Sequence, residues 1–180
     1  MRIFGVGRST VREAVKTLSN MGLLEVQQGA GTFVANLSAS DEPLEQRLKR
    51  ADIHDLDEVR KILEVAIAGK AAERRGRRDT DKIEKYLADR KTAAEAGALE
   101  ECIEADVNFH VAVAEAAHND ILCELYRSAA VHLKRGFRHI YDDTSFFLAS
   151  QPSHERLARS IAAGDAAEAV ETVVKIVEEP

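Results

Sequence analysis

After residue 53, apolar residues recur every three or four positions along the chain, which places them on one face of an α-helix. Polar stretches and capping residues divide this pattern into about six helices. Gly164 and Asp165, for example, are a helix stop followed by a cap. The expected helices are His54–Arg75, one capped by Asp79–Thr80, Leu99–Ala117, Asn119–Tyr141, Phe146–Ala163 and a last one through Val177. Because the apolar spacing is too irregular for a heptad coiled coil, we predict a bundle.

The first 34 residues show a different pattern, a short helix followed by a hairpin. Val11, Val15 and Leu18 share one helix face at spacings of four and three. The basic side chains repeat every four residues on another face, at Arg8, Arg12 and Lys16. Residues 25–34, EVQQGAGTFV, predict a tight hairpin, and no strand is expected after it. The pattern fits either half of a winged helix-turn-helix or an ordinary amphipathic surface helix followed by a turn.

The segment between these two patterns has the composition of a linker. Residues 36–53 are rich in serine and charged side chains and show no sustained apolar period, although a short helix fits Leu44–Arg50. We therefore expect a mainly α protein with three parts. These are a partial winged helix-turn-helix at 1–36, a linker at 37–53, and an all-helical domain at 54–180.

The charge of the chain differs between these parts. The net charge is -6, but residues 1–35 hold four basic and two acidic side chains, a balance of +2 that leaves -8 for the remainder. A basic N-terminal part is compatible with DNA binding, because phosphate contacts depend on local lysine and arginine. A second basic cluster, RRGRR at residues 74–78, lies where a helix is expected to end. The helix dipole and solvent explain that cluster, and a phosphate contact is the alternative.

The remaining composition indicates an ordinary cytoplasmic protein. With 180 residues and 45% hydrophobic content, the chain can bury a substantial core. It has no apolar run long enough for a membrane span and no signal-peptide core at its start. Cys102 and Cys123 lack a metal or redox spacing, so we interpret them as reduced thiols without assigned chemistry.

One pair of polar residues in the helical domain has the spacing of a metal site. Asp106 and His110 are four residues apart, so both side chains leave one helix face one turn apart. They could hold a metal ion, or Asp106 could simply orient His110 by a hydrogen bond. The neighbouring positions are apolar, which indicates a buried setting where unpaired polar groups are costly. His154, expected near the start of the fifth helix, is a third candidate ligand.

Three motifs in the N-terminal part resemble the DNA-binding signature of GntR-type transcription regulators. They are GVGRSTVREA at residues 5–14, GL at 22–23 and QGAGTFV at 28–34. The resemblance implies that the helix is a recognition helix lying in the major groove and that the hairpin is the wing. It implies DNA contacts by six residues: Arg8, Ser9, Thr10, Arg12, Gln28 and Gly29.

The resemblance also implies that part of this module is missing. Only Met1–Phe4 precede the motif, and in the GntR pattern they match the end of the second helix. A helix-turn-helix needs its first helix to brace the recognition helix. We therefore expect the apolar face of the recognition helix to lack packing partners, which costs about 1.5–3 kcal/mol per large side chain. The module should be loosened, swapped or covered by something else.

The helical part resembles the effector-binding (FCD) domain of the FadR branch of these regulators. The motifs are LDEVRKILE at 56–64, DVNFH at 106–110, HN at 118–119, His154 and GD at 164–165. The resemblance implies a divalent metal, zinc or nickel-like, on Asp106, His110 and His154, with Arg60 binding the carboxylate of a small effector. The family's fourth ligand falls at Ile176, which cannot coordinate a metal. Two histidines and one carboxylate still suffice for a first-row metal with open positions, although the missing ligand should weaken its binding. The alternative implied by the resemblance is a metal-free pocket for longer acyl ligands, as in some members of the branch.

These observations favour a ligand-responsive transcription regulator that senses a small organic acid. It is expected to be a homodimer on a palindromic double-stranded DNA operator, because two-fold symmetry in the protein is matched in the site. Two alternatives stay open. One is a small helical metalloenzyme built on Asp106, His110 and His154, which would leave residues 5–34 unexplained. The other is a truncated sensor that binds ligand but not DNA.

Overall fold

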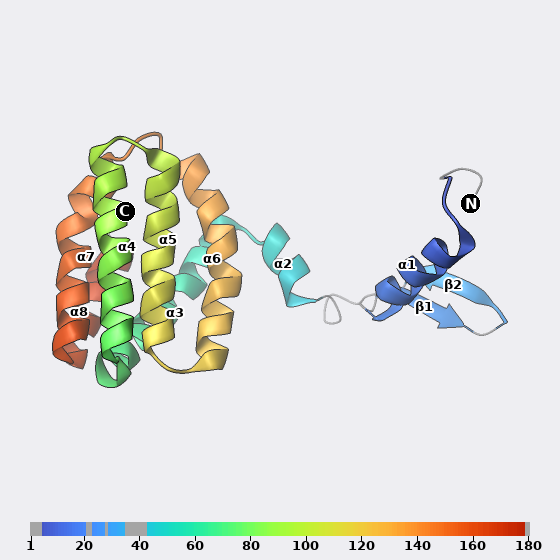
Figure 1. Cartoon of the computed structure of the whole chain (residues 1–180), viewed down its shortest axis with the longest axis horizontal. Helices are drawn as coiled ribbons and strands as arrows, with labels where there is room; N and C mark the ends of the chain where they lie inside the picture. The colour runs from blue at the N-terminus through green and yellow to red at the C-terminus, as the bar shows by residue number, and fades with distance from the viewer. Residues whose placement is uncertain (1–4, 21–22, 28, 35–42, 179–180) are drawn as a thin grey trace. The chain divides into compact units, whose positions relative to one another are not determined.

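The structure of the chain is a computed structural model that describes residues 5–20, 23–27, 29–34 and 43–178. The chain divides into two compact units, residues 1–46 and 47–180. The first unit contains a helix and a two-stranded sheet, and the second is an all-helical bundle (Figure 1). The mainly α fold predicted from the sequence is confirmed.

The first unit has the predicted helix and hairpin. Helix α1, Arg8–Asn20, is followed by strands β1, Leu24–Gln27, and β2, Gly31–Val34, which pair antiparallel. None of the residues of α1 is buried. Val11 and Leu18, on its apolar face, are each 38% exposed. Within the described residues, the face that was expected to lack packing partners is indeed poorly covered.

The linker region contains the short helix predicted there, α2, Leu44–Arg50. The bundle then has six helices, as expected. They are α3, Ile53–Arg74; α4, Arg77–Glu95; α5, Leu99–Ala116; α6, Asp120–Ile140; α7, Ser145–Ala163; and α8, Ala166–Glu178. Among the residues that the structure describes, β1 and β2 are the only strands. None of the described helices is long and apolar enough to cross a membrane.

Helix α3 lies at the centre of the bundle, in contact with α5, α6, α7 and α8. Helix α4 contacts α5 and α7 (Figure 1). Small residues allow this close packing, since α3 contributes three alanines to the core, Ala68, Ala71 and Ala72. Larger side chains such as Ile67 and Phe109 fill the same cluster. Burial of this apolar surface is the main source of stability for the bundle.

The helix ends explain the basic cluster and correct one predicted cap. Helix α4 begins at Arg77 rather than at Asp79–Thr80, and the Asp79 carboxylate accepts a hydrogen bond from Gly76 N (2.7 Å) as the third residue of a capping box. Arg74 donates to the carbonyl of Ala117, and Arg75 to that of Ala162. These contacts satisfy carbonyls at the ends of α5 and α7. For Arg74 and Arg75, these contacts favour a structural role at the helix ends over a contact with phosphate.

The stop and cap between α7 and α8 are confirmed. Gly164 adopts a left-handed conformation with φ of 81°, which glycine accepts without strain. Asp165 Oδ1 then accepts a hydrogen bond from Glu168 N (3.0 Å) at the start of α8.

Candidate functional site

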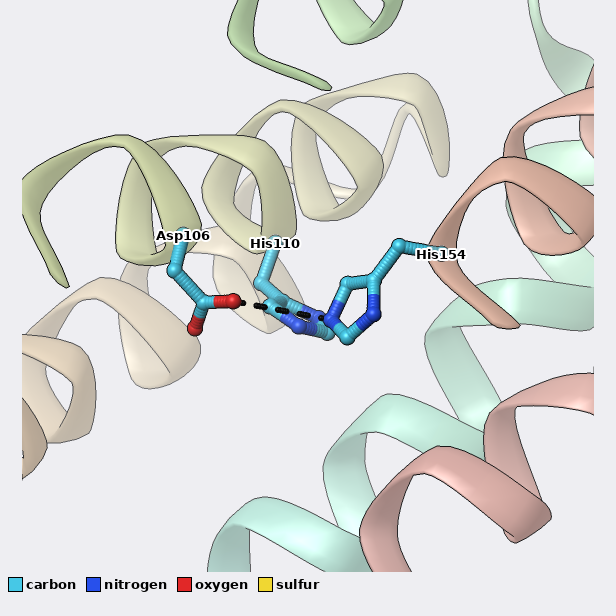
Figure 2. Close-up of side chains that lie close together, drawn as sticks. All are labelled: Asp106, His110 and His154. Atoms are coloured by element: carbon cyan, nitrogen blue, oxygen red, sulfur yellow. Dashed lines mark ion pairs between the residues drawn. The ribbon is translucent and has the colours of Figure 1, made fainter. Parts of the chain in front are cut away.

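The fold brings Asp106, His110 and His154 together inside the bundle. Asp106 and His110 lie one turn apart on α5, and His154 reaches them from α7 (Figure 2). Their potential ligand atoms all lie within 4.8 Å of one another. The three residues are 7%, 5% and 2% exposed, respectively, which agrees with the expected buried setting. His154 lies midway along Ser145–Ala163, so its expected place near the start of the fifth helix was wrong.

The imidazole of His154 is oriented for coordination. Its Nδ1 lies 2.8 Å from the carbonyl oxygen of Ser150. Because a carbonyl oxygen can only accept, Nδ1 carries the hydrogen and Nε2 presents its lone pair. That Nε2 lies 3.5 Å from Asp106 Oδ1. Burial and the nearby Arg90 cation lower the pKa of His154 to about 3, so the ring is neutral at physiological pH.

Asp106 is held by an arginine that the sequence analysis missed. Arg90, on α4, donates from Nε to Asp106 Oδ1 at 2.7 Å, and its side chain is fully buried. Burial alone would raise the pKa of Asp106, but the charge of Arg90, together with the two histidines, lowers it to about 2. Asp106 is therefore a carboxylate that is ready to bind a cation.

His110 has a carboxylate neighbour, Glu64 on α3, which is 3% exposed. Glu64 Oε1 lies 3.5 Å from His110 Nδ1 and accepts a hydrogen bond of 2.7 Å from the hydroxyl of Tyr126. A carboxylate at Nδ1 favours the tautomer whose Nε2 is free to bind a metal. Glu64 Oε2 is buried and has no hydrogen-bond partner among the described residues. From the sequence, Glu64 is part of a motif and a possible surface ion-pair partner of Arg60, four residues before it, but its place beside His110 is not predicted.

Arg60 lies beside this cluster, on the same helix as Glu64. Its Nε and Nη2 bind Asp57 Oδ1 at 2.9 Å and 2.7 Å, while Nη1 lies 3.6 Å from Glu64 Oε1. Burial disfavours the Arg60 cation, but Glu64 and Asp57 outweigh that effect and raise its pKa above the ordinary value. Arg60 is therefore a permanent positive charge at the edge of the cluster.

A cavity of about 30 Å³ joins Arg60 to the cluster. Space of this size holds one or two water molecules, so a ligand larger than that must displace side chains. The cavity is covered by aromatic rings, including Tyr141 and Phe146, which stack at 4.6 Å. Its lining comprises Arg60, Asp106, His110, Phe137, Tyr141, Phe146, Phe147, His154 and Ile176. The apolar Ile176 therefore does stand at the place where the resemblance put a fourth ligand.

The donor set fits a divalent transition metal. Imidazole and carboxylate ligands bind zinc at about 2.0–2.2 Å, so two ligands on one ion are at most about 4.4 Å apart. At the tetrahedral angle two such ligands lie about 3.4 Å apart, so the ligand atoms, which lie within 4.8 Å of one another, would move closer together on binding. Three protein ligands leave coordination positions open for water or a ligand carboxylate.

The other histidines outside the cluster have simpler surroundings. His118, in the turn between α5 and α6, has its Nε2 2.9 Å from Asp79 Oδ2 and is exposed. His132 and His139 line a separate cavity near the start of α3.

Comparison with known proteins identifies the lineage of the chain. The family model FCD domain matches residues 55–179, and the family model for bacterial regulatory proteins of the gntR family matches residues 1–34. The HTH-type transcriptional regulator LutR of Bacillus subtilis is 35% identical over 175 residues, which cover 92% of this chain and 79% of LutR. The chain belongs to the GntR family. This GntR protein is thus a transcription regulator with an FCD domain.

Other relatives of this GntR protein agree with the assignment. The Uxu operon transcriptional regulator of Escherichia coli is 38% identical over 129 residues, 69% of this chain and 49% of that protein. The putative L-lactate dehydrogenase operon regulatory protein of Escherichia coli is 32% identical over 174 residues, 90% of this chain and 66% of that protein. The chain thus spans from about half to about four fifths of these relatives. Their names are those of transcription regulators rather than enzymes.

The fold of this GntR protein also matches solved structures. The Streptococcus agalactiae GntR structure has a TM-score of 0.60 and 26% identity, covering 98% of this chain and 82% of that chain.

The residues predicted to contact DNA lie mostly on α1 of this GntR protein. Arg8, Ser9, Thr10 and Arg12 are all exposed in the first turns of the helix. Gly29 lies in the turn between β1 and β2 with φ of 85°. Gln28 lies outside the described residues. Their contacts with DNA stay a prediction.

Proposed function

We propose that the FCD domain of this regulator senses a small hydroxylated carboxylic acid in the cavity between Arg60 and the Asp106 cluster. The observation that carries this proposal is the permanent cation of Arg60 lining the same cavity as three potential metal ligands. The planar guanidinium of arginine is well suited to a carboxylate. Because the cavity holds only one or two water molecules, any acid must displace side chains to enter, and a small acid displaces the fewest. One relative is named for the L-lactate dehydrogenase operon, and lactate is an acid of this class.

The proposed site includes a divalent metal on Asp106, His110 and His154. When bound, the ion would supply positive charge and open positions for an effector carboxylate. His154 would bind through Nε2, because Ser150 holds its Nδ1 hydrogen. His110 would be oriented by Glu64 in the same way. Ile176 adds no ligand, so water or the effector would complete the coordination.

The N-terminal unit would read DNA through Arg8, Ser9, Thr10 and Arg12 on α1, with Gln28 and Gly29 at the wing. Arginine pairs bidentately with guanine in the major groove, while serine and threonine reach either bases or phosphates. We propose that the regulator acts as a homodimer on a palindromic operator, and that effector binding changes the spacing of its two DNA-reading units.

Fluorescence anisotropy on DNA from upstream of the protein's own gene tests the effector proposal. We expect L-lactate to change the affinity of the wild-type chain for this DNA. Arg60→Gln should abolish the response. Lys61→Gln is the matched control, because Lys61 is the adjacent cation, contacts the same Asp57, and is 43% exposed. An equal response to L-lactate in wild type and Arg60→Gln would contradict the role of Arg60.

Elemental analysis tests the metal proposal on protein purified without a histidine tag. We expect about one equivalent of a divalent transition metal per chain, lost in His110→Ala. His118→Ala, which changes an exposed histidine, should keep the metal. A content well below one equivalent in the wild-type protein would remove the metal from the proposed site.

A further inference from the structure

Arg90 is a fully buried cation that the proposed function does not use. Besides Asp106, its guanidinium donates to the carbonyl of Phe147, the amide oxygen of Gln151 and the hydroxyl of Ser150, each at 2.7 Å. Four of its five N–H groups therefore face identified acceptors. An arginine is seldom buried so completely unless its charge and donors are paired.

These hydrogen bonds connect the helices that carry the proposed ligands. Arg90 lies on α4, Asp106 on α5, and the three other acceptors on α7, one to two turns before His154. Ser150 accepts from Arg90 through its hydroxyl and from His154 through its carbonyl. Arg90 thus fixes Asp106 and the backbone that orients His154 without any metal.

Arg90 supplies the positive charge that the buried carboxylate of Asp106 would otherwise take from a metal ion. A buried carboxylate without a cation is costly, and Arg90 removes that cost for Asp106. The oxygen it binds, Oδ1, is also the one that lies 3.5 Å from His154 Nε2. A divalent ion bound to Oδ1 would share this oxygen with the guanidinium, and an ion bound to either oxygen of Asp106 would lie near the positive charge of Arg90.

We propose that Arg90 is a built-in counter-ion of Asp106, which keeps the ligand set assembled in the metal-free protein and weakens the binding of divalent metal. This positioning role rests on the proposed metal site. It predicts a sensor whose helical domain is folded with or without metal.

The test compares the wild-type chain with Arg90→Met, in which an unbranched apolar side chain replaces the cation. Two quantities are measured on the full chain, the Kd for Zn²⁺ by competition with a chromophoric chelator and the Tm with and without Zn²⁺. We expect Arg90→Met to have a lower Tm without metal, to bind Zn²⁺ about tenfold more tightly or better, and to regain most of the lost Tm when Zn²⁺ is added. The wild-type Tm should respond less to Zn²⁺.

Two further variants separate charge from packing. Arg90→Lys keeps the cation and should bind Zn²⁺ with an affinity close to wild type. Arg90→Gln is uncharged but can still donate to one acceptor on α7, so it should shift the Kd in the same direction as Arg90→Met. Unchanged or weaker Zn²⁺ binding in both uncharged variants would overturn the counter-ion role, as would failure of both to fold even with Zn²⁺ present.

The wild-type protein and His110→Ala distinguish this inference from the proposed site. If wild type binds Zn²⁺ and His110→Ala does not, the metal site stands whatever the Arg90 variants do. If neither the wild type nor the uncharged Arg90 variants bind Zn²⁺, the proposed metal site fails and the inference fails with it.

Discussion

Helices α1 and α5 are both amphipathic, yet they differ in how much of their function depends on the rest of the molecule. No residue of α1 is buried, and the side chains predicted to bind DNA project directly from its surface. Helix α5 buries ten of its eighteen residues, including Asp106 and His110. Four of the six predicted DNA contacts therefore lie on a single helix, whereas the proposed sensor site needs α3, α4, α5 and α7 packed together. Four predictions test this contrast.

The largest expected effect concerns core packing. Phe109→Ala should reduce the free energy of unfolding by about 3–5 kcal/mol, because it leaves a cavity in the centre of the bundle. Phe33→Ala, in the hairpin, should change it far less, since Phe33 is 47% exposed and Phe109 is 0% exposed. Urea denaturation followed by circular dichroism measures both. Equal losses for the two variants would contradict the contrast between the units.

The second prediction concerns the pH dependence of the bundle in the presence of a chelator. The pKa of His154 is lowered from 6.5 to about 3. Between these pH values His154 is therefore protonated in the unfolded chain and neutral in the folded chain. The contribution of His154 to the free energy of unfolding is complete above about pH 6.5 and falls by about 1.4 kcal/mol per pH unit below it, until about pH 3. The measurement is urea denaturation at several pH values.

His154→Gln should flatten this pH dependence, and His118→Gln should not. His118 is the matched control because its side chain is 54% exposed. A wild-type stability that does not change between pH 6.5 and pH 4.5 would show that His154 is not held neutral by the fold.

A third, smaller effect is expected at Glu64. Glu64→Gln removes the charge beside Arg60 and His110, and should cost about 1–3 kcal/mol of stability because the buried partners exchange a charged acceptor for a neutral one. Glu58→Gln, on an exposed position of the same helix, should change stability by less than about 0.5 kcal/mol. Thermal unfolding of both variants decides this. If Glu64→Gln unfolds at the same Tm as wild type, the buried carboxylate is not needed for the stability of the bundle.

The smallest effect on stability is expected at the DNA-reading surface. Arg12→Ala should leave the free energy of unfolding within about 0.5 kcal/mol of wild type, because Arg12 is exposed. It should still weaken operator binding in anisotropy titrations at several salt concentrations. If Arg12 contacts a phosphate, its loss lowers the magnitude of the slope of log binding constant against log salt concentration by about one. If Arg12 contacts a base, its loss relaxes the sequence preference. Loss of folding in Arg12→Ala would contradict the independence of this surface.

The sequence predicted the elements well because their signals are local. The number of helices in the bundle, the helix at Leu44–Arg50 and the stop at Gly164 all follow from patterns within a few residues. The start of α4 was misplaced because a glycine N-cap carries no side-chain signal, and Asp79 instead acts from inside the helix. Such errors are confined to helix ends.

The candidate site was predictable only in part. Asp106 and His110 were found because one helix turn joins them. His154 was only a candidate until the resemblance to a known family joined it to the other two residues, since nothing in its own helix points to them. Arg90 was missed because it lies among charged neighbours such as Asp89 and Lys91 and reads as part of a solvated face. The acceptors of Arg90 lie on two other helices, and residue spacing within one helix does not predict such contacts.

The residue that ends α7 has little freedom to vary. A Cβ at Gly164 would lie 2.6 Å from Arg75 Nη2, the same guanidinium that binds the carbonyl of Ala162. Asparagine, which tolerates the left-handed conformation at many helix ends, would collide here with the arginine that completes the turn. Any replacement would therefore have to displace the flexible guanidinium of Arg75 from the carbonyl of Ala162, in addition to placing a side chain on a backbone with φ of 81°.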